Sequence, residues 1–169
     1  MIVQIIQNSY GKSRVRLIKV ARNEDLHEIQ NLTVNIALEG DFEQIHTVGD
    51  NSLCLPTDTM KNTVYALAGE TEELEQPEAF GRRLAAFFLA NNQQVSAARI
   101  QIYQTSWNRM LAGRDEHSHA FVKGGEEKRT ALITATRTSV TLETGIEDLV
   151  VLKTSGSCFT GFIKDKYTT

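Results

Sequence analysis

The pair Thr57-Asp58, directly after Pro56, is the place where residue types point most clearly to chemistry. Threonine and aspartate are preferred at helix N-caps because their side-chain oxygens accept hydrogen bonds from free backbone N–H groups. The same N–H groups and the positive end of the helix dipole attract anions. The sequence therefore predicts a helix start here, serving simple capping, binding of a negative ligand, or both.

Lys12 is a second candidate, in a Tyr-Gly-Lys stretch near the N-terminus. A lysine in a turn is ordinarily a solvated charge. It gains a chemical role beside a hydroxyl whose proton must leave, because a nearby amine accepts that proton or lowers the pKa of the hydroxyl. Lys12 is thus a candidate base on the condition that the fold brings it to such a hydroxyl.

His117 and His119 have the spacing of metal ligands, since residues two apart on a strand share a face. The pattern offers no third ligand, so we expect a structural network of loop histidines and no metal site. Gly124-Gly125 lacks the Gly-Lys-Ser/Thr continuation of a phosphate-binding loop. Phe159 is typical of a core residue unless a planar ligand lies beside it.

The composition narrows the class of protein. The chain has 169 residues, of which 41% are hydrophobic and 23% charged, as in a globular protein with a core. Eighteen basic against 21 acidic residues exclude a globally basic surface for nucleic acid. Cys54 and Cys158 form no CxxC pair, which argues against a zinc or disulfide scaffold. No apolar run is long enough for a bilayer and no signal peptide is evident, so we expect no membrane partner and a reducing compartment.

Around these residues the sequence predicts strands at both ends of the chain. Residues 2–7 and 14–22 are expected to form a hairpin turning at residues 8–11, with a bulge between Leu17 and Ile18. Residues 22–25 carry a turn signal, and residues 32–38 alternate cleanly as a half-buried strand. Further strands are expected in three later segments, which are residues 98–103, 130–142 and 149–153.

The middle of the chain predicts two helices. Residues 57–69 carry an apolar stripe of Met60, Val64, Leu67 and Ala68, and residues 77–92 carry one of Phe80, Leu84, Phe87 and Phe88. The order is two strands, two helices and two or more strands. We therefore expect an α+β fold, an antiparallel sheet with both helices on one face. Its open edges favour oligomers that join edge to edge.

Several short blocks, in order along the whole chain, resemble the urate oxidase (uricase) family. The most characteristic is residues 57–65, which resemble the family stretch TDxxKNTxY. The last block, residues 157–169, resembles SxFxGFxxDxYTT. The other blocks are residues 10–16, 38–42, 49–52, 107–109, 117–121, 127–129 and 152–153.

The resemblance implies a tunnelling fold of order ββααββ, assembled edge to edge into a barrel and a homotetramer with active sites at subunit interfaces. It implies residues 1–143 as one domain and 144–169 as the start of a second, completed by a C-terminal uricase part of the same gene or a separate fragment. By motif, Lys12 and Thr57 match the catalytic pair, Thr57 and Asp58 bind substrate, and Phe159 stacks on the purine. The implied reaction oxidises urate with O2 to 5-hydroxyisourate and hydrogen peroxide without metal or cofactor.

Two other readings remain open from the sequence. One is a non-catalytic purine- or pterin-binding subunit of the same fold. The other is a zinc enzyme of that fold, which His117 and His119 with bound zinc would favour. The resemblance places the protein in the cytoplasm, or in peroxisomes if the source is eukaryotic, and it implies neither nucleic acid nor membrane as a partner.

Overall fold

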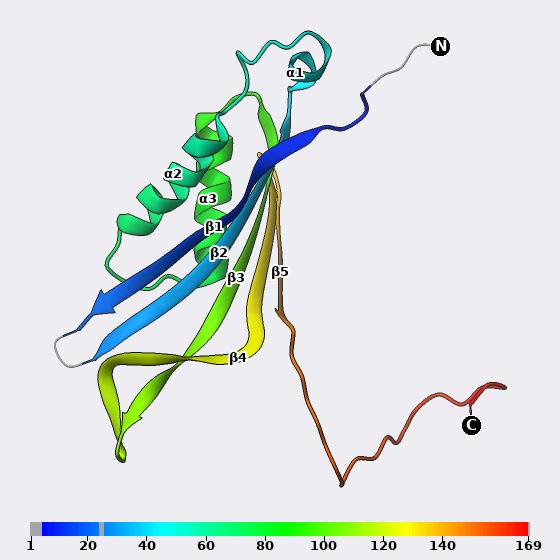
Figure 1. Ribbon diagram of the computed structural model, residues 1–169. Helices are drawn as coiled ribbons and strands as arrows, with labels where there is room; N and C mark the ends of the chain where they lie inside the picture. Colours follow the sequence, from blue (N-terminus) through cyan, green and yellow to red (C-terminus); the bar gives the residue numbers. More distant parts are fainter. Residues whose placement is uncertain (1–4, 24–25, 169) are drawn as a thin grey trace.

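The computed structural model describes residues 5–23 and 26–168. Within these residues the chain forms β1 (Ser9–Arg22), β2 (His27–Gly40), α1 (Glu43–Thr47), α2 (Thr57–Gly69), α3 (Pro77–Asn91), β3 (Val95–Ala112), β4 (Asp115–Thr136) and β5 (Val140–Glu147). The strands make one antiparallel sheet in the order β1-β2-β3-β4-β5. Figure 1 shows α2 and α3 together on one face of that sheet, which confirms the expected α+β arrangement.

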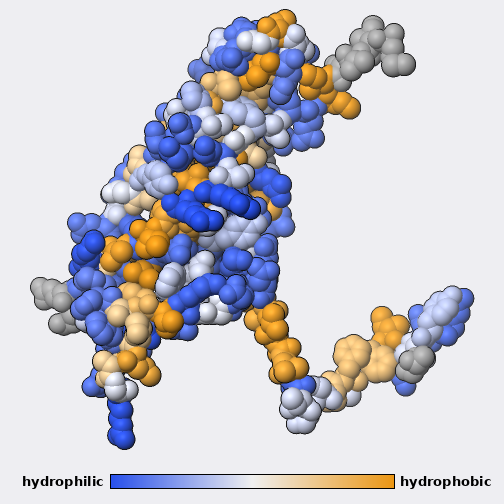
Figure 2. All heavy atoms as spheres, in the orientation of Figure 1, coloured by the Kyte–Doolittle hydropathy of each residue, from blue (hydrophilic) through white to orange (hydrophobic). Residues whose placement is uncertain are grey.

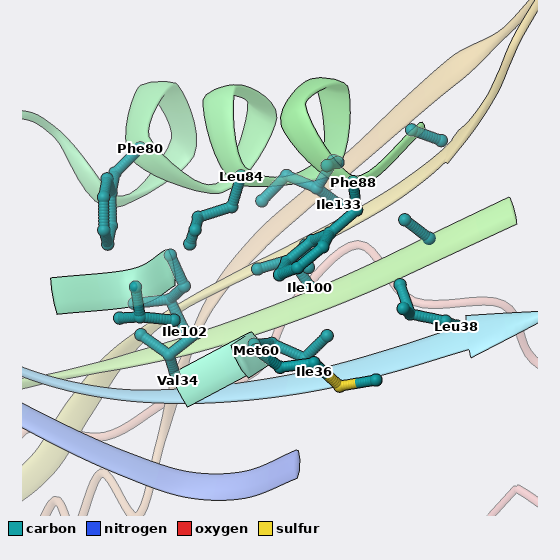
Figure 3. Packing of buried hydrophobic residues seen from close by; sticks show 14 of the residues in the cluster. Val34, Ile36, Leu38, Met60, Phe80, Leu84, Phe88, Ile100, Ile102 and Ile133 are labelled. Carbon is teal, nitrogen blue, oxygen red and sulfur yellow. The ribbon is translucent and has the colours of Figure 1, made fainter. Parts of the chain in front are cut away.

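The core lies between this face and the two long helices. α2 packs against β1, and α3 packs against β3 and β4. Strand residues of β2 and β3 that alternate toward the helices are wholly or almost wholly buried, and Figure 3 shows several of them below α3: Val34, Ile36, Leu38, Ile100 and Ile102. This alternation is the period-two pattern of a sheet with one covered face.

Most of the apolar residues predicted to face the core from the two helices are buried. Met60, Val64 and Leu67 of α2 are buried. On α3, Phe80, Leu84 and Phe88 are buried, whereas the prediction that Phe87 joins them is wrong, because 38% of it is exposed. Phe87 lies toward α2 and lines a shallow groove with Thr59 and other α2 residues.

The N-terminal hairpin differs from its prediction. The strand expected at residues 2–7 falls partly outside the described residues, and residues 5–8 form no strand. The expected turn at residues 8–11 is wrong, because Ser9, Tyr10 and Gly11 already pair with β2. The expected turn at residues 22–25 includes two residues outside the described part, and β1 and β2 form a hairpin across it. Pairing with the long strand β2 thus outweighed the turn preference of the residues around Gly11.

The second half of the sheet, strands β4 and β5, also differs from the strands that the sequence predicted. β4 spans Gly124-Gly125, but its pairing with β3 shifts register there, since Thr105 pairs with Lys128 and Trp107 with Lys123. The strand expected over residues 130–142 is two strands, because Thr136 N–H bonds Ser139 O at 2.8 Å and turns the chain. Between them Arg137 donates to the carbonyls of Leu89 and Asn92, where its charge suits the C-terminal end of α3. The short helix α1 was not predicted.

After β5 the chain leaves the sheet. The strand expected over residues 149–153 is not formed, and Figure 1 shows this segment extending away from the helices. Asp148, directly after β5, still accepts a hydrogen bond from Lys128 of β4, whereas the described side-chain hydrogen bonds beyond it stay within the segment, as between Lys153 and Gly156. The domain division after residue 143 stays a prediction, and β5 runs across that position. Over the described residues no helix is long and apolar enough to cross a membrane.

Candidate functional site

The candidate site lies where β1 passes the start of α2. α2 begins at Thr57, as expected, but the capping prediction is wrong in detail. Pro56 occupies the cap position, and no side-chain cap hydrogen bond is formed there. The first intrahelical bond runs from Met60 N–H to Pro56 O. The N–H groups of the first turn are therefore available to an acceptor outside the helix.

Lys12 reaches this helix start from β1. Its Nζ lies 3.9 Å from Oδ1 of Asp58, and Lys61 Nζ lies 3.1 Å from the same oxygen. The hydrogen bond and charge of Lys61, followed by the charge of Lys12, lower the pKa of Asp58. The structure thus brings Lys12 to Asp58, the residue that follows Thr57 at the helix start. Lys61, three residues after Asp58 and on the same side of the helix, was not singled out from the sequence.

A β-bulge sets the direction of Lys12. Lys12 pairs with Ile36 and Val15 with Val34, so β1 carries one more residue than β2 between these pairs. Ile36 and Val34 are buried under the helices, and paired residues share a face. The extra residue therefore lets Lys12 and Val15, three apart, lie on the same side of the sheet.

The bulge was expected between Leu17 and Ile18 and is found between Lys12 and Val15. Arg14 has a φ of 58°, in the left-handed region, and its N–H donates to Oδ1 of Asn35 at 2.8 Å. The amide side chain across the strands thus replaces the ladder bond that the bulge removes. The alternation of β1 gave no sign of this, because Arg14 is an unusual residue for a positive φ.

Phe159 is not brought to this site. It lies in the segment after β5 with 79% of its surface exposed, and its ring stacks on Phe162 with centroids 5.1 Å apart. The expectation that it belongs to a core is wrong for the described residues. A ring so exposed is free to stack on another planar group.

His117 and His119 lie at the other end of the sheet, near the turn between β3 and β4. Their ring centroids are 4.6 Å apart, and His27 approaches His119 at 5.9 Å. Ser118 Oγ lies 2.8 Å from His119 Nδ1. The described residues contain no group of three or more His, Cys, Asp or Glu side chains placed to hold a metal. These contacts form a histidine network as predicted, but His117 and His119 lie on strand β4, whereas a loop was expected.

The five-stranded antiparallel sheet with α2 and α3 on one face is the arrangement of the tunnelling-fold class. The uricase family model matches residues 8–134. The chain belongs to the uricase family.

Relatives and solved structures agree with this assignment. The chain is 45% identical to the uricase of Arthrobacter globiformis over 163 residues, covering 96% of this chain and 52% of that protein. It is 34% identical to the uricase of Schizosaccharomyces pombe, covering 96% of this chain and 56% of that protein. The crystal structure of the Arthrobacter globiformis uricase superposes with a TM-score of 0.85 at 44% identity, covering 100% of this chain and 57% of that one. The chain thus spans about half the length of the relatives it matches.

Proposed function

We propose that this chain is the N-terminal part of a cofactor-independent urate oxidase. The reaction converts urate, O2 and water into 5-hydroxyisourate and hydrogen peroxide. Two electrons leave urate and reduce O2 to peroxide, and the oxygen of water becomes the new hydroxyl group. Membership of the uricase family is the observation that carries this proposal.

Lys12 and Thr57 act in the proposal as the proton-transfer pair. The support is geometric: the bulge turns Lys12 toward the helix that begins at Thr57, and Lys12 lies within ion-pair distance of the adjacent Asp58. An amine beside a hydroxyl can take its proton and pass it on. The protein then needs to deprotonate and orient urate, since the substrate itself supplies the electrons.

Thr57 and Asp58 bind the anionic substrate in the proposal, with the backbone N–H of Asp58 as its contact. The uncapped first turn of α2 supports this, because free N–H groups and the helix dipole favour a negative ligand. The Asp58 carboxylate would oppose an anion, but Lys61 and Lys12 both lie close to it. Their charges offset that repulsion.

Phe159 stacks on the purine once the site is completed by other chain segments. The segment that carries it exposes several hydrophobic residues, and Figure 2 shows apolar side chains along it. The most exposed are Val150, Val151, Leu152, Phe159, Ile163 and Tyr167. Such a surface is typical of one that is covered by another part of the protein. We propose that residues 144–169 begin a second domain, that a C-terminal uricase part completes it, and that a homotetramer forms the sites at its interfaces.

The test uses the completed enzyme, meaning this chain together with the C-terminal uricase part. Lys12→Met and Thr57→Ala are each expected to lower turnover by about two orders of magnitude, as for loss of a proton-transfer group. Turnover is followed by the loss of urate absorbance and by peroxide formation. Lys19→Met is the matched control, because Lys19 lies on the same strand and bonds the distant Thr71.

Three results would count against the proposal. Unchanged turnover in both site variants refutes the assigned roles. Urate-dependent peroxide production by this chain alone refutes the need for a C-terminal part. Binding of a purine by the completed protein without any oxidation would instead indicate the non-catalytic subunit.

A further inference from the structure

The hydroxyl of Tyr10 joins β1 to the loop before α2 through two hydrogen bonds. Its oxygen accepts from the N–H of Leu55 at 2.7 Å and donates to the carbonyl of Leu55 at 3.1 Å. One side chain thus satisfies both backbone groups of a residue 45 positions away. Removing it would leave a partly buried N–H without its partner, which is costly.

The ring of Tyr10 is held as firmly as its hydroxyl. It packs edge to face against Phe42, which is 1% exposed, with ring centroids 4.7 Å apart. Burial, followed by the neighbouring Cys54, raises the pKa of Tyr10 to about 12. The hydroxyl therefore keeps its proton at neutral pH and remains able to donate to Leu55.

Tyr10 links the two halves of the candidate site. Tyr10 pairs with Leu38 and Lys12 with Ile36, so both face the helices from β1, two residues apart. Leu55, which Tyr10 holds, is two residues before Thr57. Hydrogen bonds thus join the strand that carries Lys12 to the loop that leads to Thr57, two residues away from each proposed reacting group.

We infer that Tyr10 is a positioning residue, which sets the distance between Lys12 and the Thr57 hydroxyl; this rests on the roles proposed above. Without its hydroxyl, the Leu55 backbone is free to move relative to β1, and Thr57 moves with it. A misplacement of about 1 Å in a catalytic group costs about 100-fold in rate. We therefore expect Tyr10→Phe to lower turnover by about 10- to 100-fold.

The variant Tyr10→Phe keeps the ring against Phe42 and removes only the bridging oxygen. Tyr65→Phe is the matched control. The Tyr65 hydroxyl also joins α2 to β1, because it donates to Arg16 O at 3.1 Å, but Tyr65 lies two turns after the start of the helix. Both variants are measured in the completed enzyme, well below its melting temperature. Tyr10→Phe should lose turnover, and Tyr65→Phe should retain it.

A double-mutant cycle separates positioning from general loss of structure. If Tyr10 acts through the Lys12–Thr57 pair, then adding Tyr10→Phe to Lys12→Met should cause no further loss of turnover. A purely structural role would lower turnover by the same factor in both backgrounds, which overturns the inference. Full turnover in Tyr10→Phe overturns it as well.

The outcome for Lys12→Met keeps the two proposals apart. If Lys12→Met is slow and Tyr10→Phe is not, the inference on Tyr10 fails and the proposed function stands. If Lys12→Met itself turns over normally, the proposed roles of the pair fail. Hydrogen exchange at residues 54–58 gives a readout that does not depend on activity, and faster exchange confined to these residues is expected in Tyr10→Phe.

Discussion

Gly11, between Tyr10 and Lys12, is the position where a single methyl group should have the largest effect on the site. A Cβ at Gly11 would lie 1.8 Å from the carbonyl oxygen of Ile36 and 2.9 Å from Cα of Ala37. Ordinary C···O contacts are about 3.3 Å or longer, so β1 would have to move from β2 by about 1.5 Å. Both groups belong to the backbone of the partner strand, so no side-chain rotation relieves the clash.

Overpacking of this kind costs about 1–3 kcal/mol, and we place Gly11→Ala near 3 kcal/mol because backbone must move. For a chain of this size, about 2–4 °C of melting temperature accompany each kcal/mol. Gly11→Ala is therefore expected to lower the melting temperature of the chain by about 6–12 °C, followed by circular dichroism. In the completed enzyme it should also lower turnover, because Lys12 is the next residue.

Gly69→Ala is the matched control, with the opposite sign. Gly69 ends α2 with helical backbone, and a Cβ there meets nothing within 4 Å. Alanine at such a position is expected to stabilise by about 0.5–1 kcal/mol. An unchanged melting temperature in Gly11→Ala, or an equal loss in both variants, would refute the close approach of β1 to β2.

Two further predictions concern the core and the charges of the site. Phe88→Ala should destabilise the chain by about 3–5 kcal/mol in guanidinium unfolding, because Phe88 is fully buried, whereas Phe87→Ala should cost far less; equal losses would contradict the assigned face of α3. The pKa of Asp58, followed by carboxyl NMR, should lie below its ordinary value, rise most in Lys61→Met and rise less in Lys12→Met. Because the folded-state pKa is lowered, the Asp58 contribution to stability is present above its unfolded pKa and lost as pH falls through the folded one. The reverse order of the two lysine variants would show that Lys12 is the nearer partner.

The elements that could be predicted from the sequence were those marked by the spacing of their apolar residues and by residue type. The apolar spacing of Met60, Val64 and Leu67 gave α2, and the alternation of residues 32–38 lies within β2. Both signals are strong because each element turns one face to a single core. Turn signals were less reliable: residues 9–11, which were expected to turn, joined β1, since pairing with a neighbouring strand outweighs local preference.

The candidate residues Lys12, Thr57 and Asp58 were named from type and motif, and the sequence by itself determined that α2 begins at Thr57. Only the tertiary structure decided that Lys12 faces this helix start, because that depends on one extra residue in β1 and on Asn35 accepting the Arg14 N–H. It likewise decided that Tyr10 holds Leu55, a contact across 45 positions. Such contacts leave no periodic trace, because they depend on where separate segments meet in space. The local pattern of a chain specifies its elements, and their packing specifies which side chains meet.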